Sequence, residues 1–456
     1  MKMRKAFYMI FAAVMMCSCG IYTKYEPQTS VPDNLYGDSL SYGTDTASLG
    51  NVYWRELFTD TLLQNLIEEG LANNTDYKSA QLRIEEAEAT LLAAKLAYLP
   101  SFAFAPQGSV SSFDNQKATQ TYQLPITASW ELDVFGRIRN AKLQAKALYA
   151  KSIDYKQAVR TQLIASIANA YYTLQMLDAQ LDLTKRTMTS WEETVETARA
   201  LMKAGQYNEA AVAQMEASLH GVRASVLDIK EQINQTENSL SIILGEAPQK
   251  HQRGKLCQMQ LDCDITVGVP LQMLSNRPDV RSAERSLESA FYATNQARSA
   301  FYPQITLSGS VGWTNAVGSA ILNPGKFLAE ALGSLTQPLF NKGQNVAQLR
   351  ISKAQQEEAR LAFQQALLNA GSEVNDALTA YQTSHAKTSI YSKQVESLQT
   401  ALRSTKLLMQ HGNTNYLEVL TAQQSLLNAE LQQVANMFTE VQSVISLYQA
   451  LGGGRD

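Results

Sequence analysis

The chain has 456 residues, 45% of them hydrophobic, and a formal net charge of −3. A chain of this length commonly folds as two or three globular domains, but 11 prolines and 23 glycines give few places to separate them, which favours long uninterrupted elements. The acidic balance argues against nucleic acid as a partner. The sequence has no GxGxxG, Walker, HExxH or GxSxG motif and its four histidines are scattered, so we expect no enzyme, no cofactor and no metal site.

The amino terminus has the pattern of an export signal. Lys2, Arg4 and Lys5 precede an apolar run over residues 6–16, which is typical of a secretory signal and too short to span a bilayer. Its end, with Ser18 directly before Cys19, resembles a bacterial lipoprotein signal. We predict a signal peptide over 1–18 and lipidation of Cys19; an ordinary secretory signal is the alternative. Cleavage there removes three basic residues and no acidic one, which takes the formal charge from −3 to −6.

Residues 61–245 are predicted to form a repeat of helix, two strands and two further helices. Apolar and polar residues alternate from Tyr122 onward, which predicts a strand with two different faces. The span 137–203 has no proline or glycine and predicts one helix roughly 100 Å long. Gly205 ends it, and a short turn would reverse the chain. The expected ranges are strands at about 101–112 and 120–135 and helices at 137–203 and 207–245.

The same order recurs in residues 273–451. Pro303 follows Pro100 by 203 positions, and Gly412 follows Gly205 by 207, so the chain contains an internal two-fold repeat. Each proline is predicted to stand at a border from helix to strand. Apolar residues at a 3.5-residue spacing in the last helix of each repeat predict antiparallel coiled coils. The expected ranges are strands at about 304–314 and 327–340 and helices at 344–410 and 414–450.

Cys257 and Cys263 lie between the two repeats. In an exported protein, two thiols six positions apart most simply form a small disulfide-bonded loop. Two unpaired thiols remain an alternative, and a metal site would need more ligands than these.

Four amphipathic strands per chain cannot close by themselves in a membrane. If the apolar faces contact lipid, two open sheet edges would leave unpaired backbone groups in hydrocarbon. Closure across two chains would give a side-chain-filled barrel of about eight strands, and three chains would give about twelve strands around water. The polar faces favour the trimer. A soluble sheet partly covered by helices would show the same alternation and remains an alternative.

Several stretches, in this order and spacing, resemble one family over nearly the whole chain. They are WRELFTDTLLQNLIEEGLANNTDY, WELDVFGRIRNA, RPDVRSAERSL, FYPQITLSGSVGW, NYLEVLTAQQSLLNAELQQ and YQALGGG. The sequence resembles the TolC-type outer membrane efflux factors, in particular the NodT-like lipoprotein subgroup that serves resistance-nodulation-division pumps.

This resemblance implies a mainly α-helical chain with a membrane β-barrel. Three chains would form a 12-stranded barrel in the outer membrane and an α-helical tunnel in the periplasm, and segments 19–60 and 246–272 would form an equatorial belt. The helix tips at Gly205 and Gly412 would contact a periplasmic adaptor, which links the homotrimer to an inner membrane pump. The implied function is export of small molecules. A type I protein secretion channel and a lipid-anchored structural coiled coil or adhesin are the alternatives.

The resemblance also implies a gate at the helix tips. Leu417 and Glu418 occupy positions where family members carry a leucine and an acidic residue that form rings across three chains. A second acidic position of the family holds Thr421 here, which weakens any expectation that depends on that acid. Ordinary hairpin packing of Leu417 and a solvated surface position for Glu418 are the alternatives.

Overall fold

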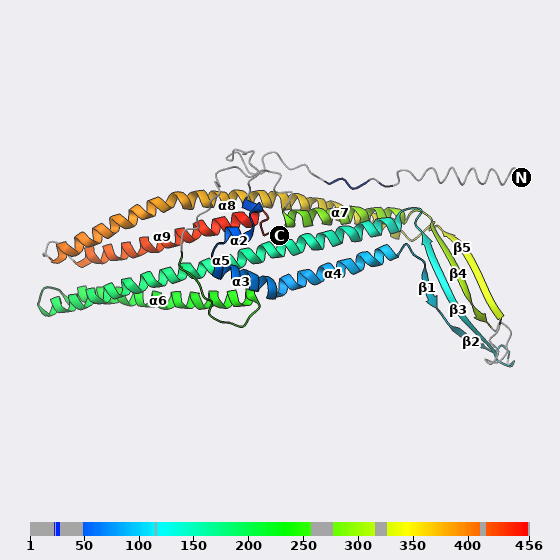
Figure 1. The fold of residues 1–456 in the computed structure, drawn as a ribbon, viewed down its shortest axis with the longest axis horizontal. Coiled ribbons are helices and arrows are strands. Elements are labelled where there is room, and N and C mark those ends of the chain that lie inside the picture. Colours follow the sequence, from blue (N-terminus) through cyan, green and yellow to red (C-terminus); the bar gives the residue numbers. More distant parts are fainter. Residues whose placement is uncertain are drawn as a thin grey trace. The chain divides into compact units, whose positions relative to one another are not determined.

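The computed structural model describes residues 22, 24–27, 49–114, 116–256, 277–314, 326–410 and 416–454. It divides into a sheet unit, with residues 82–153 and 281–365, and a hairpin unit, with residues 30–81, 154–280 and 366–456. The elements are η1 Leu49–Asn51, α2 Trp54–Leu57, α3 Thr61–Asn73, α4 Thr75–Leu96, β1 Ser101–Phe104, β2 Gln107–Ser111, β3 Thr119–Leu132, α5 Arg137–Lys203, α6 Glu209–Leu244, α7 Pro278–Ser299, β4 Gln304–Thr314, β5 Lys326–Thr336, α8 Gln344–Gln410 and α9 Tyr416–Ala450. Figure 1 labels all of these except η1. Among these described residues, every helix is too short or too polar to cross a membrane.

The sheet unit contains one antiparallel sheet in the order β1-β3-β4-β5, and β2 pairs with β3 beyond β1. The strand predicted at 101–112 is therefore broken in two. Pro106 lies in the break and has no amide hydrogen to donate to a ladder, while the Ala105 amide still donates to the Pro125 carbonyl oxygen at 3.1 Å. The result is four strand positions, with β1 and β2 sharing one edge and β5 forming the other.

Two other predicted strands end earlier than expected. The strand predicted to reach residue 135 ends at Leu132, because the Asp133 carboxylate accepts hydrogen bonds from the Ile138 and Arg139 amides and starts α5. The strand predicted at 327–340 ends at Thr336, since Pro338 cannot continue the ladder.

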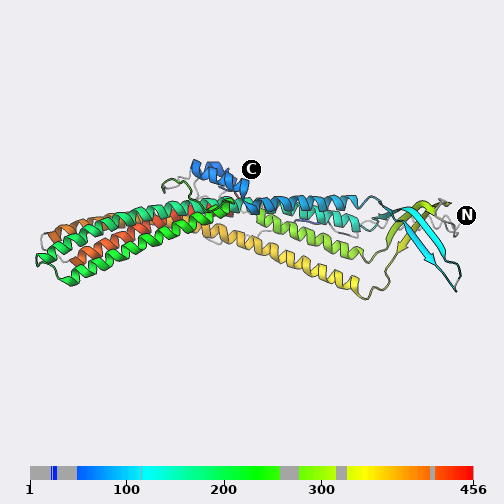
Figure 2. The same ribbon diagram turned by 90° about the horizontal axis from the view of Figure 1, so that it is seen from below.

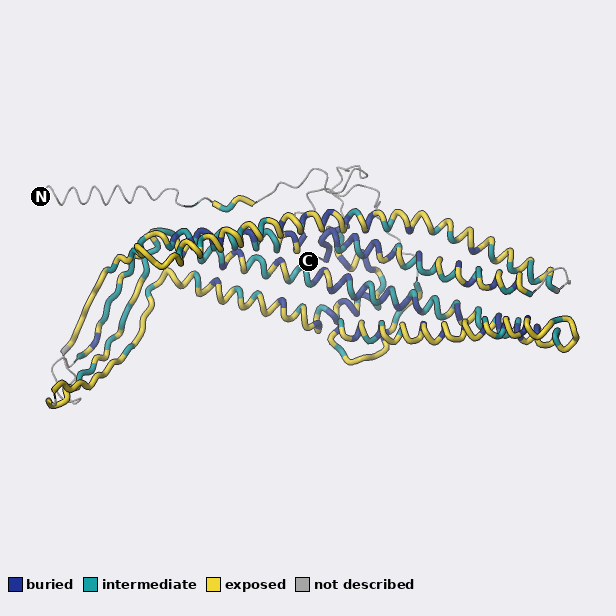
Figure 3. The backbone as a smooth tube through the Cα atoms, turned by 180° about the vertical axis from the view of Figure 1, so that it is seen from behind, coloured by how far each residue is buried: buried dark blue, intermediate teal, exposed yellow. Residues whose placement is uncertain are grey.

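The strand register separates the two faces of the sheet. Leu124, Ile126, Trp130 and Leu132 of β3 pair with Trp313, Val311, Leu307 and Ile305 of β4. Thr127, Ser129 and Glu131 pair with Ser310, Ser308 and Thr306 on the opposite face. Most of the apolar face is exposed, with Phe102 71%, Phe104 65% and Trp313 49% accessible (Figure 3). Among the described residues of the sheet unit, no helix covers the sheet's apolar face as the soluble alternative requires.

Both predicted border prolines lie between a helix and a strand. Pro100 stands between the end of α4 at Leu96 and the start of β1 at Ser101. Pro303 stands between the end of α7 at Ser299 and the start of β4 at Gln304. The missing amide hydrogen and fixed φ of proline oppose continuation of either helix.

The hairpin unit pairs α5 with α6 and α8 with α9 (Figure 2). Gly205 adopts a φ of +74° after α5, and the Gln206 amide donates to the Leu201 carbonyl oxygen at 2.9 Å. This is a Schellman-type end, for which glycine is the favoured residue. Gly412, the predicted counterpart, lies outside the described residues. The mainly α-helical fold class with long helical hairpins is confirmed.

The predicted apolar stripes pack as expected. In α6 most residues at the 3.5-residue spacing are buried, among them Met215, Leu219, Val222, Val226 and Ile229, and the others are half-buried. In α9 the buried set includes Leu427, Val441, Ile445 and Tyr448. Helix propensity alone does not hold helices of this length in place, and the packed stripes supply most of the stabilisation.

Another core of the hairpin unit joins residues near position 54 to residues near position 450. Trp54, Phe58, Ile67, Tyr171 and Tyr448 are all less than 2% exposed. The Tyr448 hydroxyl donates to the Val52 carbonyl oxygen at 3.1 Å and accepts from the Gly454 amide at 2.7 Å. The Thr161 hydroxyl donates to the Gly453 carbonyl oxygen at 2.6 Å. A Cβ on Gly453 would lie 2.4 Å from the Tyr448 ring, so the YQALGGG stretch needs glycine there.

Candidate functional site

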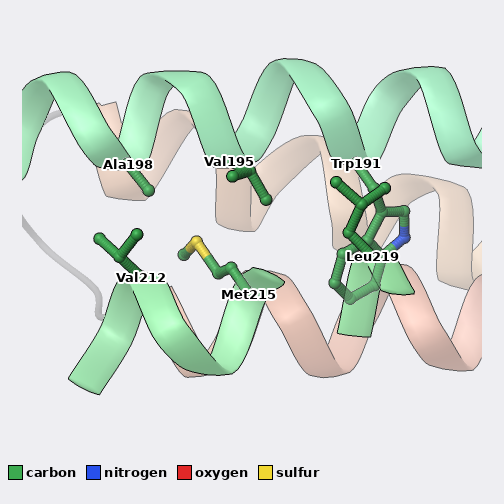
Figure 4. Packing of buried hydrophobic residues seen from close by; sticks show 6 residues of the cluster. All are labelled: Trp191, Val195, Ala198, Val212, Met215 and Leu219. Carbon is green, nitrogen blue, oxygen red and sulfur yellow. The ribbon is translucent and has the colours of Figure 1, made fainter. Parts of the chain in front are cut away.

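The turn end of the α5–α6 hairpin has its own apolar core. Trp191, Val195 and Ala198 of α5 face Val212, Met215 and Leu219 of α6 (Figure 4), and each is less than 7% exposed. Tyr416 and Leu420 of α9 are partly buried against this cluster. The start of α9 is therefore attached to the other hairpin, and we call this arrangement the tip core.

The candidate gate residues lie on the side of α9 that faces away from the tip core. Val419 is 1% exposed and Leu420 packs on the cluster, whereas Leu417 is 52% exposed and Glu418 is exposed. The exposure of Leu417 is inconsistent with burial inside a hairpin of its own chain. The Thr421 hydroxyl, at the departing position, donates to the Leu417 carbonyl oxygen at 2.8 Å. The structure thus places Leu417 and Glu418 together on one exposed surface.

A polar seam joins the hairpins behind the tip core. The Gln423 side-chain amide of α9 donates to the Thr194 hydroxyl of α5 at 3.3 Å, and Lys406 of α8 donates to the Ser190 hydroxyl of α5 at 3.4 Å. A cavity of about 210 Å³ lies beside this seam and is lined by Trp191 and Gln423 among others. Gln423 Oε1 and Trp191 Nε1 are buried and have no hydrogen-bond partner among the described residues.

Unpaired buried polar groups lower the stability of the contact in which they lie. A buried acceptor without a donor costs about 1–3 kcal/mol. The polar seam therefore stabilises the contact between the hairpins less than an apolar seam of the same shape would. The tip core stabilises the contact between hairpins and the polar seam weakens it.

Sequence reasoning missed a second cluster, where the segment after α6 is fixed to the helices. The Arg253 guanidinium, 13% exposed, forms ion pairs with Asp178 of α5 at 2.6 Å and Glu237 of α6 at 2.7 Å. The Asp178 carboxylate is the main cause that raises the pKa of Arg253. His251 is within hydrogen-bond distance of the buried Ser241 hydroxyl at 2.8 Å, and burial lowers the pKa of His251.

The same segment reaches the core through Tyr171. Its hydroxyl donates to the Asp60 carboxylate at 2.5 Å and accepts from the Gly254 amide at 3.1 Å. Burial, together with Asp60, raises the pKa of Tyr171 to about 12. Residues 251–254 are therefore tied to both hairpin helices and to the segment before α3; that residues 246–272 form a belt stays a prediction.

Arg277 forms a third cluster, within the RPDV stretch. Its guanidinium donates to the Ala450 carbonyl oxygen at the end of α9 at 3.0 Å and pairs with Asp279 at 2.6 Å and Glu373 at 2.7 Å. Although burial lowers the pKa of Arg277, hydrogen bonds to Asp279 and Glu373 raise it above its ordinary value. The signal in the sequence was the RPDV motif itself, but the motif did not indicate which partners the arginine would find.

The remaining predicted site residues do not gather with the tip. Pro100 and Pro303 belong to the sheet unit and Gly205 to the hairpin unit. Cys19, Cys257 and Cys263 lie outside the described residues, so their lipidation and pairing stay predictions. Within the described ranges no three His, Cys, Asp or Glu side chains are grouped as a metal site would need.

Comparison with known proteins agrees over nearly the whole chain. The model of the outer membrane efflux protein family matches residues 66–246 and 269–453. The chain is 28% identical over 452 residues to the cation efflux system protein CusC of Escherichia coli K12, covering 97% of this chain and 98% of the relative. It is 26% identical over 437 residues to the probable outer membrane lipoprotein SilC of Salmonella typhimurium, covering 94% of each. The open-state structure of the MtrE outer membrane channel of Neisseria gonorrhoeae superposes with a TM-score of 0.84 at 28% identity, over 96% of this chain and 98% of that one.

Proposed function

Because the chain belongs to the outer membrane efflux protein family, and is thus an efflux channel of the outer membrane, we propose that it acts as a homotrimer in a tripartite pump. Three copies form a 12-stranded barrel in the outer membrane and a helical tunnel in the periplasm. Cys19 carries the lipid that anchors each copy. A periplasmic adaptor contacts the tip turns and links the tunnel to an inner membrane pump, and the complex exports small molecules.

One observation supports this proposal above the others, namely the two faces and two open edges of the sheet. Its apolar face is exposed along β1, β3, β4 and β5, and the opposite face carries mostly hydroxyl and amide side chains. In hydrocarbon each unpaired backbone group at the β1 and β5 edges costs several kcal/mol, which together exceeds a typical folding free energy of about 5–15 kcal/mol. Pairing β5 of one copy with β1 of the next removes both edges.

The number of copies follows from the polar face. Two copies would give eight strands, whose interior is filled by side chains. The hydroxyl rows of β3 and β4 instead need water or polar partners, because burying a hydroxyl without a hydrogen bond costs about 1–3 kcal/mol. Three copies give twelve strands and a water-filled lumen, which satisfies these groups.

We assign closure of the channel to the turn ends of the helical hairpins. Leu417 and Glu418 share an exposed surface at the start of α9, where threefold symmetry brings three copies of each around the axis. Opening is a population shift in which the α8–α9 hairpin separates from the tip core, and the bound adaptor stabilises the open arrangement. Gly205 and Gly412 mark the turns that the adaptor contacts.

Cysteine labelling tests the sheet assignment. Ile305 and Thr306 are neighbours on β4 that point to opposite faces. In proteoliposomes, Ile305→Cys should react with a lipid-soluble maleimide and Thr306→Cys with a charged, water-soluble thiol reagent. Equal reaction of both variants with the water-soluble reagent would contradict a membrane-spanning sheet. Single-channel conductance of the wild-type protein separates the channel from a structural coiled coil or adhesin.

Charge removal at the tip tests the gate. Glu418→Ala should reduce the preference for cations or change the leak conductance in planar bilayers, because three carboxylates leave the narrowest part of the path. Glu209→Ala is a matched control, since Glu209 is also an exposed acid in the first turn of a hairpin's second helix. Unchanged ion selectivity in Glu418→Ala would remove this residue from the gate.

A further inference from the structure

The polar face of the sheet is interrupted on one strand. Leu328, Glu330 and Leu332 of β5 pair with Gly312, Ser310 and Ser308 of β4. Those β4 positions lie on the face that carries Thr306 and Thr314, opposite the Ile305, Leu307, Val311 and Trp313 face. Two leucines with a carboxylate between them therefore stand on a face otherwise rich in hydroxyl groups.

The Glu330 carboxylate is open to its surroundings. Its side chain is exposed, and the nearest β4 residues on the same face, Ser308, Ser310 and Gly312, are too small to cover it. Leu328 and Leu332 are 41% and 57% exposed. The other acidic side chain described in the strands, Glu131, is paired with Arg137 at the start of α5, whereas Glu330 has no ion pair among the described residues.

The proposed trimer gives this group of three residues a defined setting, so any role for the group rests on the proposed function. Twelve strands spaced about 4.8 Å apart and tilted by about 40° enclose a barrel of radius about 12 Å. Threefold symmetry places the three Glu330 side chains at one height on the lumen wall, more than a Debye length of about 8 Å apart at physiological ionic strength. Each copy therefore presents a separate subsite in place of one shared ring.

We infer that Leu328, Glu330 and Leu332 form a lumenal subsite for organic cations that carry apolar surface. The carboxylate supplies the charge partner. The two leucines, two residues away on either side along the strand, supply apolar contact that the neighbouring serines and threonines do not offer. A cation without apolar groups gains only the screened charge interaction, and an anion of equal shape gains only the apolar contact.

Block of single-channel current tests the subsite on the full-length lipidated protein. The probes are tetraphenylphosphonium, tetraphenylborate as an anion of the same shape, and tetramethylammonium as a cation without rings. Tetraphenylphosphonium should block the wild-type channel at the lowest concentration of the three. Glu330→Gln should weaken this block about fivefold, the upper range for one exposed charge pair. Leu332→Ser should weaken it by about threefold or more, because apolar contact is lost.

Relocating the charge makes the test specific to this position. The double variant Glu330→Gln with Ser310→Asp returns a carboxylate to the neighbouring strand at the same level of the sheet and should recover part of the block. The inference is wrong if Glu330→Gln conducts and is blocked like the wild type, or if the phosphonium and borate ions block the wild type equally. If Glu330→Gln does not assemble, unchanged block in Leu332→Ser overturns it. A wild-type protein that forms no channel would instead contradict the proposed function itself.

Discussion

Replacing Gln423 with leucine should close the tip more tightly. The Gln423 side chain is 4% exposed, its Oε1 has no partner among the described residues, and its Nε2 donates to the Thr194 hydroxyl at 3.3 Å. Thr194 does not depend on that bond, because its hydroxyl donates to the Ser190 carbonyl oxygen at 2.8 Å. The substitution therefore removes a buried polar group without leaving a new unsatisfied donor.

The expected magnitude depends on these contacts. Removing an unsatisfied buried acceptor gains about 1–3 kcal/mol, and losing a long, neutral hydrogen bond costs about 0.5–1 kcal/mol. Leucine is of similar size and would lie near Leu402, Leu426 and Leu427, which line the same cavity. The net gain is about 1 kcal/mol, which raises the ratio of closed to open tips about fivefold.

Two measurements check this gain. Single-channel open probability in planar bilayers should fall about fivefold in Gln423→Leu, and the thermal unfolding midpoint should rise by about 2 °C or less in a protein of this size. Gln424→Leu is the matched control, because Gln424 is exposed on the next position of the same helix. A lower midpoint or a higher open probability in Gln423→Leu alone would refute the reasoning, since the buried amide would then be stabilising the closed seam.

Three further substitutions address the hairpin unit. Tyr448→Phe removes the hydroxyl that bonds to Val52 and Gly454 and should lower the free energy of unfolding by about 2 kcal/mol in denaturant titrations. Because the folded pKa of Tyr448, about 12, lies above its usual value of 10.0, the wild type should lose stability as the pH rises from 10 to 12, and the variant should not show this loss. Arg277→Met removes a buried guanidinium from carboxylate partners that are half exposed. It should lower the free energy of unfolding by about 2–3 kcal/mol in the same titration. An unchanged free energy would show that the ion pairs only offset the cost of desolvating the guanidinium. His251 has a lowered pKa in the folded state, so its contribution to stability is complete above pH 6.5 and is lost on acidification below that value; His251→Gln should flatten this acid dependence and His220→Gln, at an exposed position, should not.

The long helices and their buried sides could be predicted, because the sequence repeats and its apolar residues are periodic. A span of 67 residues without proline or glycine predicted α5, and the structure has a helix over the same residues, Arg137–Lys203. The 3.5-residue stripe of α6 predicted its buried side. Both signals are local, so one sequence suffices to find them.

Where the strands begin and end was harder to predict, because single residues decide it. Pro106 breaks the first strand, and Asp133 ends the third strand by capping α5. The β5 stretch FLAEALGSL has leucines on both faces, so alternation alone did not assign Glu330 to the polar face. Pairing with β4 assigned it, and that pairing is a property of the sheet rather than of the segment.

The polar clusters could not be predicted for a different reason. Arg253 lies 75 positions from Asp178 and 16 from Glu237, and no local pattern indicates that these three side chains meet. Trp191 belongs to a long helix whose apolar residues are spread around its surface, so its place in the tip core depends on where Met215 and Leu219 of α6 approach it. Leu417 and Glu418 are exposed, and their role in a gate stays a prediction from the family resemblance.

The contacts of Tyr448 with Val52 and Gly454 have a consequence for folding. Residues 52 and 448 are separated by 396 positions, so the core around Trp54 lacks these contacts until residues 448–454 have been synthesised. Contacts this distant in sequence form slowly, because a long loop must close before they contribute any stabilisation. A nascent chain that lacks its final glycines should therefore remain open to periplasmic proteases and chaperones. Closing this core therefore needs residues near position 454 as well as residues near position 52, however early the helices between them form.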